Sequence, residues 1–350
     1  MSTFKRFLQY YKPYKGIFFM DLFCALIMCI VDLSFPLILS YCTGKFFLKS
    51  SNEILKGVLF LGIGLLIMYV IRALCRYYVS CQGHVMGANM ESDMRQDLFN
   101  QYQRLSFSYY DKHNTGVMMS RVVSDLFDIC EFAHHGPENL FISLFKIIGS
   151  FIILATIYWP LALILLAVTV VMMAFSYSQN KKMRRTFMEN RKKIGSVNAS
   201  LQDSLGGIRV VQSFANEDIE IDKFNHSNME FLESKKDNYR VMGTFQGGNN
   251  FFQGLLYVTI IVFGGLFIAN GDLNPIVLAT FALYINVFVS PIEVLVEFTE
   301  MFQKGFSGFR RFEEVMNEIP EIQDSKNAKD LKNVSGNIDF DHVSFQYNEN

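Results

Sequence analysis

The stretch LFISLFKIIGSFIILATIYWPLALILLAVTVVMMAFSY, residues Leu140 to Tyr177, contains two long apolar runs that are separated only by Trp159 and Pro160. Each run is close to the roughly 20 apolar residues that a helix needs to cross the hydrocarbon core of a bilayer. Trp159-Pro160 therefore predicts a very short connection between two membrane-spanning segments.

Four further runs of the same kind surround this stretch in the 350-residue chain. The expected spans are 17–42, 54–79, 140–158, 161–177, 251–269 and 276–298. A chain that is 51% hydrophobic, with its apolar residues clustered, is too apolar for an ordinary soluble enzyme. The first run is too long for a secretory signal and lacks a small-residue cleavage site. The sequence predicts an all-α membrane protein with six long transmembrane helices.

Basic residues predict the orientation, because loops rich in lysine and arginine stay in the cytoplasm. They are dense before the first span and after the fourth, whereas the opposite loops contain only Lys45 and Lys49. The dense groups are Lys5, Arg6, Lys12 and Lys15, and Lys181, Lys182, Arg184, Arg185, Arg191, Lys192 and Lys193. We expect a multi-pass protein of the cell membrane with both termini cytoplasmic. The net charge of −1 gives no reason to expect a nucleic-acid partner.

The connections between spans two and three, and between spans four and five, are predicted to be helical hairpins. In the second, apolar residues recur every three or four positions, which marks one face of a helix. These residues are Ile194, Val197, Leu201, Leu205, Ile208 and Val211. A helix over 178–214 would project roughly 50 Å beyond the membrane at 1.5 Å per residue. In the first, 90–110 is predicted to be helical, and the turn formers of 111–116 precede a return from Val117.

The pattern changes after the sixth span. Ile319-Pro320 ends the helix, and polar residues follow. Apolar residues then occupy nearly alternate positions, which predicts a β-strand: Ile338, Phe340, Val343, Phe345 and Tyr347. The predicted organisation is an N-terminal segment (1–16), a transmembrane domain (17–318), a linker (319–336) and the first strand of a further domain (337–350). A lone strand has no partner for its backbone groups, so we expect this last segment to be poorly anchored.

Four segments, in this order, resemble the ABC transporter family, of the exporter type in which membrane and ATPase domains share one chain. They are LSFSYYDKHNTGVMMSRVVSDL (105–126), SLGGIRVVQSFANEDIEIDKF (204–224), SPIEVL (290–295) with GFRRFEEVMN (308–317), and GNIDFDHVSFQYNEN (336–350). The resemblance implies an ATP-driven exporter that moves a hydrophobic or amphipathic solute out of the cytoplasm by alternating access. It also implies a second half-transporter chain as partner, in a homodimer or heterodimer, and nucleotide-binding domains.

The resemblance further implies that the two hairpin tips are coupling elements that dock on those domains. The tip residues are Asp111, Lys112, His113, Asn114, Thr115 and Gly116, and Phe214, Ala215, Asn216, Glu217 and Asp218. The alternative interpretation is that they are capped turns in solvent.

By the same resemblance, Tyr347 would stack on the adenine of ATP, a role that suits a flat aromatic ring. The alternative is a core aromatic of the strand. ATP and Mg²⁺ are the cofactors expected of the complete protein. The chain contains no G-x-x-x-x-G-K-[ST] phosphate loop, no Ser-Gly-Gly-Gln signature and no Asp-Glu catalytic pair. We therefore expect that these 350 residues neither bind nor hydrolyse ATP alone, and that hydrolysis depends on residues beyond Asn350 or on another chain.

Ionisable residues within membrane spans are costly and indicate function by default. Asp32, Glu293 and Glu297 are the candidates for a substrate path. The alternative places Glu293 and Glu297 at the inner membrane boundary, paired with Arg72 and Arg76. Two other functional classes stay open: a membrane-embedded enzyme that uses these carboxylates, and an ABC-like scaffold or sensor without transport activity.

His134 and His135 are adjacent, and the sequence offers no third ligand at metal-site spacing. We interpret them as a surface pair at a helix start and expect no metal. The six cysteines, Cys24, Cys29, Cys42, Cys75, Cys81 and Cys130, are interpreted as small apolar residues.

Overall fold

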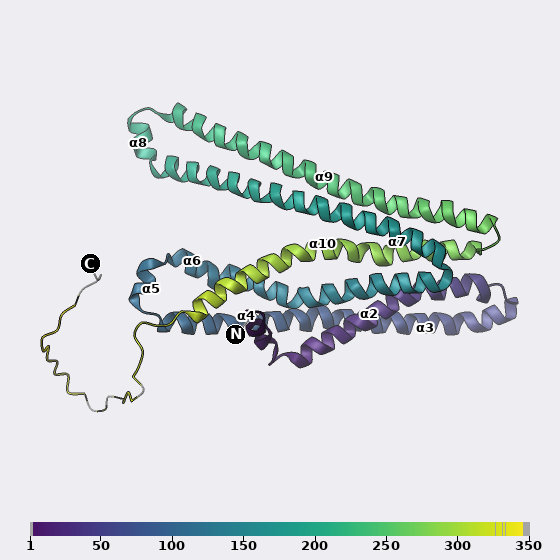
Figure 1. Ribbon diagram of the computed structural model, residues 1–350, viewed down its shortest axis with the longest axis horizontal. Helices are drawn as coiled ribbons and strands as arrows, with labels where there is room; N and C mark the ends of the chain where they lie inside the picture. Colours follow the sequence, from purple (N-terminus) through teal and green to yellow (C-terminus); the bar gives the residue numbers. More distant parts are fainter. Residues whose placement is uncertain (1–2, 326, 331, 333, 346–350) are drawn as a thin grey trace.

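The computed structural model describes residues 3–325, 327–330, 332 and 334–345, and these residues form helices but no strand. Five helical segments are long and apolar enough to cross a membrane: Lys15–Phe46, Ser51–Arg104, Thr115–Gly206, Glu217–Ala269 and Pro275–Asn317. The prediction of an all-α membrane fold is confirmed. Figure 1 shows the long helices running lengthwise, with one helical hairpin diverging from the others.

The helices in chain order are α1 (Thr3–Phe7), η1 (Leu8–Tyr11), α2 (Lys15–Tyr41), η2 (Cys42–Phe46), α3 (Ser51–Tyr78), η3 (Val79–Gly83), α4 (His84–Arg104), α5 (Phe107–Lys112), α6 (Thr115–Ser120), η4 (Arg121–Asp125), α7 (Leu126–Gly206), α8 (Ile208–Ser213), α9 (Glu217–Ala269) and α10 (Pro275–Asn317).

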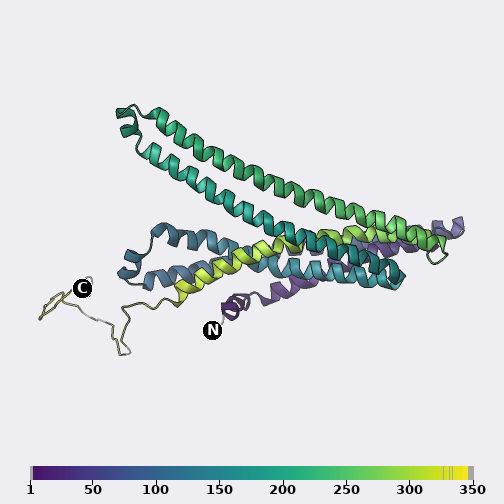
Figure 2. The same cartoon turned by 45° about the horizontal axis from the view of Figure 1, so that its top comes forward.

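Helix α7 contains both apolar runs of the 140–177 stretch and reverses its direction between them (Figures 1 and 2). The reversal lies at Tyr158, whose backbone is extended, with φ −158° and ψ 97°. Pro160 has no N–H to donate, so the hydrogen-bond ladder of the helix is interrupted here. The short connection predicted at Trp159-Pro160 is therefore present, one residue earlier and without a separate loop.

Both predicted hairpins are present, and their tips contain short helices that the sequence did not indicate. Short α5 and α6 form the first tip, and the side chain of Asn114 caps α6 by accepting a hydrogen bond from the Gly116 N–H at 2.7 Å. In the second hairpin the helix breaks at Gly207, and short α8 leads into the turn before α9. Ala215 in this turn has φ 51°, a left-handed conformation that favours glycine.

Two apolar clusters hold the long helices together. One lies between α7, α9 and α10 and includes Leu161, Leu256, Phe281 and Phe288. In the other, methionines of α4 such as Met90 pack against α7 and the end of α10. The first cluster extends to α2, where the Tyr284 hydroxyl donates a hydrogen bond to the Leu33 carbonyl oxygen at 2.5 Å.

Three tyrosines attach the N-terminal segment to α4 and α7. The Tyr10 and Tyr14 hydroxyls donate to the Asp97 and Asp93 carboxylates at 2.7 and 2.8 Å. The Tyr11 hydroxyl donates to the Ala133 carbonyl oxygen at 2.6 Å. Burial, together with the Asp97 carboxylate, raises the pKa of Tyr10 above its usual range. These hydroxyls therefore stay protonated donors at neutral pH.

The predicted strand over 337–350 is wrong for the described part of that segment. Residues 337–345 are exposed and have no strand conformation. Period-two alternation predicts a strand only where a neighbouring strand can accept its backbone hydrogen bonds, and the described residues supply none. Residues 346–350, including Tyr347, lie outside the described residues.

Gly305 allows α10 to approach α7 closely. A Cβ at this position would lie 2.4 Å from Phe132 Cβ and 3.1 Å from the Asp128 carbonyl oxygen. Neither atom can rotate away, so we expect Gly305→Ala to lower the free energy of unfolding by about 1–3 kcal/mol. Thermal unfolding in lipid nanodiscs measures this change. Gly243→Ala is the control, since its Cβ meets no described atom within 4 Å. Equal shifts for both variants would contradict the close packing.

Candidate functional site

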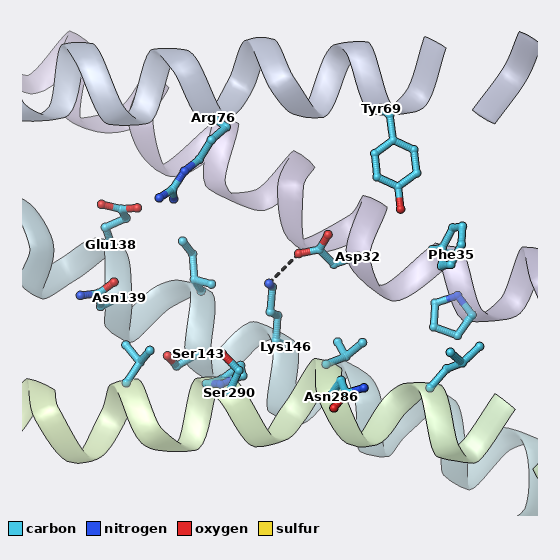
Figure 3. Close-up of a pocket in the computed structure, with 16 residues that line it drawn as sticks. Asp32, Phe35, Tyr69, Arg76, Glu138, Asn139, Ser143, Lys146, Asn286 and Ser290 are labelled. Carbon is cyan, nitrogen blue, oxygen red and sulfur yellow. Dashed lines mark ion pairs between the residues drawn. The ribbon is translucent and has the colours of Figure 1, made fainter. Parts of the chain in front are cut away.

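A cavity of about 430 Å³ lies between α2, α3, α7 and α10. Figure 3 shows polar side chains from all four helices at its wall, including Asp32, Arg76, Lys146 and Asn286. Apolar side chains such as Phe35 complete the lining. Polar residues make up more than half of this lining, so the cavity is a concave site that is more polar than the usual small-molecule site.

Asp32 on α2 is the centre of an ion-pair network at this cavity. Its carboxylate accepts hydrogen bonds from Lys146 Nζ of α7 at 2.6 Å and from Arg72 Nε of α3 at 2.7 Å. The Asp32 and Lys146 side chains are only 17% and 20% exposed. A charge in a membrane span is costly unless it is paired or reaches water. The network therefore neutralises the charge of Asp32 and connects α2, α3 and α7.

Two further side chains of opposite charge lie at one end of the cavity, to one side of Asp32 and Lys146. Figure 3 shows the Arg76 guanidinium on the same side of the cavity as the Glu138 carboxylate. Glu138 is buried. With Asp32 and Lys146, the cavity wall contains two acidic and two basic side chains. Its charges balance, so the wall matches a ligand with both polar and apolar parts better than a simple cation.

The other two candidates for a substrate path lie elsewhere. Glu293 and Glu297 are on α10, are exposed, and are not among the described residues that line the cavity. Arg72, which the alternative interpretation paired with these two acids, instead pairs with Asp32. Asp32 is thus both paired and at the cavity wall.

Sequence reasoning missed Lys146 and Glu138. Lys146 interrupts the apolar run 140–158, and a lone ionisable residue inside a span is a recognisable signal. Glu138 precedes that run by two residues and had no such signal. Its place in the cavity follows from the packing of α7 against α2 and α10.

Both hairpin tips expose apolar side chains. At the first tip, residues 111–116 are exposed together with Phe107 and Met119. At the second, Phe214 is 74% exposed, and Val210 and Ile219 are also exposed. Turns that face only solvent do not require clustered, exposed apolar side chains, whereas docking surfaces commonly contain them.

Ion pairs connect two of the segments on which the resemblance rests. Arg311 on α10 donates from Nε and Nη2 to the two carboxylate oxygens of Asp125 in η4, both at 2.6 Å. Arg121, also in η4, lies 3.7 Å from Glu314. The return limb of the first hairpin is thereby attached to the end of α10.

The residues of this chain do not fit a nucleotide phosphate site. The sequence contains no Gly-x-x-x-x-Gly-Lys-Ser/Thr loop. Tyr347, the residue implied to contact adenine, is outside the described residues.

Comparison with known proteins adds direct support for the resemblance. The family model of the ABC transporter transmembrane region matches residues 18–292. The ABC transporter ATP-binding protein YwjA of Bacillus subtilis is 37% identical over 99% of this chain and 60% of its own length. The ATP-dependent lipid A-core flippase of Syntrophus aciditrophicus is 24% identical, over 100% of this chain and 58% of its own. The putative multidrug export ATP-binding/permease protein YgaD of Bacillus subtilis is 26% identical, over 99% and 60%.

The chain thus spans about 60% of the length of these relatives. The family match extends from α2 into the first part of α10 and includes both hairpins with their tips. This chain therefore belongs to the ABC transporter family and represents the transmembrane region of an exporter-type member.

Proposed function

We propose that this chain is the membrane-spanning part of an ATP-driven exporter, which moves an amphipathic or hydrophobic solute out of the cytoplasm by alternating access. The observation that carries the proposal is the cavity of about 430 Å³ between α2, α3, α7 and α10. Its balanced charges and its mixed polar and apolar lining suit a solute with a polar head and an apolar body. Two of the helices that form it, α7 and α10, are also connected to the hairpins.

We further propose six membrane spans with both termini and both hairpin tips in the cytoplasm. The reversal of α7 at Tyr158 supports this count, because it divides one continuous helix into two spans. The basic residues that follow the fourth span support the orientation. The transmembrane region then covers about 17–318.

Nucleotide-binding domains and a second half-transporter chain are the proposed partners. The exposed apolar residues of the two tips support docking of such domains there. Within α3, all of whose residues are described, Cys75 alone is buried, so this apolar helix faces lipid or another chain. ATP bound in those domains would supply the energy, and the long helices of the hairpins would act as rigid levers.

Phe214→Ala tests the coupling role of the second tip. We expect the loss of about 2 kcal/mol of docking free energy, which corresponds to a roughly 30-fold fall in solute-stimulated ATP hydrolysis when the concentration of nucleotide-binding domains limits the rate. The thermal unfolding temperature should not change, because Phe214 is exposed. Solute-stimulated ATP hydrolysis in proteoliposomes that contain the nucleotide-binding domains measures the effect.

Tyr239→Ala is the matched control, since Tyr239 is an exposed aromatic residue on α9 away from the tip. Equal loss in both variants would argue against coupling at Phe214. Absence of any solute-dependent ATP hydrolysis in the unmodified protein would contradict the proposed function and favour a scaffold or sensor.

A further inference from the structure

Three histidines lie close together, one just after the second expected span and two just before the third. Ligand nitrogens of His84, His134 and His135 all lie within 4.8 Å of one another. The interpretation of His134-His135 as a surface pair at a helix start is wrong, because both are inside α7 and His134 is only 3% exposed. The third histidine comes from the start of α4, 50 residues before His134, a separation that ligand spacing in the sequence does not reveal.

The donor atoms converge at nearly the spacing that a metal ion requires. His134 Nε2 lies 3.2 Å from His84 Nδ1 and 4.0 Å from Glu138 Oε2. His135 Nδ1 lies 3.7 Å from the same Glu138 oxygen. Ligand atoms bound tetrahedrally to zinc at 2.0–2.1 Å are about 3.3 Å apart, so the 3.2 Å pair already has this spacing, and the 3.7 and 4.0 Å pairs must close by about 0.4 and 0.7 Å. The three imidazole nitrogens form the cluster, and the Glu138 carboxylate, which lies beside His134 and His135, is the fourth donor that would complete a set for such an ion once its side chain moves closer to His84.

Two buried polar atoms beside the cluster lack hydrogen-bond partners among the described residues: His134 Nδ1 and Asp21 Oδ1. Both face Gly83, whose Cβ, if present, would lie 2.8 Å from the first and 3.1 Å from the second. A histidine that binds a metal through one nitrogen usually donates its other N–H to a carboxylate. The two atoms are not hydrogen-bonded to each other in the structure, and Asp21 would supply that carboxylate to His134 by moving toward it when the ion binds.

His135 also has carboxylates next to both of its ring nitrogens. Its Nδ1 faces Glu138, and its Nε2 lies 3.7 Å from Glu131 Oε2. His84 is exposed and gives an ion access to the otherwise buried donors.

We propose that His84, His134, His135 and Glu138 form a binding site for a divalent transition-metal ion of the zinc class, with Asp21 and Glu131 as orienting carboxylates. Glu138 also lines the cavity. A bound ion would hold Glu138 at the cluster and fix the start of α4 against α7. The ion would thereby change the charge that the cavity presents, which is a route to regulation of the transport proposed above. The binding site itself does not depend on that function.

Titration with Co²⁺ and Zn²⁺ alone, on metal-free protein in lipid nanodiscs, tests the site. We expect one Co²⁺ per chain at this site, with the visible spectrum of tetrahedral nitrogen and oxygen coordination, and its displacement by Zn²⁺. His84→Asn and His135→Asn should each weaken Zn²⁺ binding at least about 100-fold, and Glu131→Gln about 10-fold. His226→Asn is the control, since this exposed histidine pairs with Glu230 far from the cluster.

Unchanged affinity and stoichiometry in His84→Asn and His135→Asn would overturn the proposal, as would a spectrum with sulfur-to-cobalt charge transfer, which would assign the ion to cysteines. His84 is exposed, so its substitution should leave the thermal unfolding of the metal-free protein unchanged. These measurements need no transport, so failure of the metal site and failure of the exporter function are separate outcomes.

Discussion

Asp32→Ala is expected to lower the free energy of unfolding by about 2–4 kcal/mol, because it leaves Lys146 and Arg72 without their shared counter-ion. Removal of one partner from a buried ion pair typically costs about 3–5 kcal/mol. The estimate is lower here because the Arg72 side chain is 36% exposed and can reach polar surroundings. Thermal or denaturant unfolding in lipid nanodiscs measures the loss.

A double-mutant cycle isolates the interaction from other effects of the substitution. In Asp32→Ala with Lys146→Met, the second cation of the network is also removed, so at least half of the lost stability should return. Glu233→Ala is the control, since Glu233 and Lys236 form an exposed pair on α9 at 2.7 Å. An exposed pair of this kind contributes less than about 1 kcal/mol. A loss for Asp32→Ala no larger than for Glu233→Ala would mean that water screens the network.

The spans and hairpins could be predicted from the sequence because their signals are local. An apolar run near 20 residues and a three- or four-residue repeat both specify a helix without knowledge of its neighbours. Even the reversal of α7 was indicated by Pro160. The strand predicted over 337–345, which the structure does not contain, shows the limit of local signals. Alternation of apolar and polar residues does not reveal whether a partner strand is present.

The cavity and the histidine cluster depend on pairs that are distant in the sequence. Asp32 and Lys146 come from α2 and α7, and His84 joins His134 only when α4 packs on α7. No periodicity within either helix contains that information. The sites could not be predicted for a physical reason. Residue spacing describes a single helix, whereas a site forms only when several helices pack together.

Arg311→Met is expected to destabilise the contact between α10 and the first hairpin by about 2–3 kcal/mol. Its guanidinium binds both oxygens of Asp125 and also donates to Ser307 Oγ at 2.9 Å. The Asp125 side chain is only 12% exposed, so its carboxylate would remain buried and unpaired. The 40% exposure of Arg311 places the cost below that of a fully buried pair.

Unfolding of Arg311→Met in nanodiscs is best compared with that of Arg310→Met, an exposed neighbour on the same helix, which should change stability by less than about 0.5 kcal/mol. Asp125→Leu combined with Arg311→Met removes both charges and should restore most of the stability, because apolar residues replace a buried pair at little cost. Equal stability of the two arginine variants would contradict the role of this pair. If stability returns in the double variant while solute-stimulated ATP hydrolysis does not, the pair transmits motion from the first tip to α10 beyond its contribution to folding.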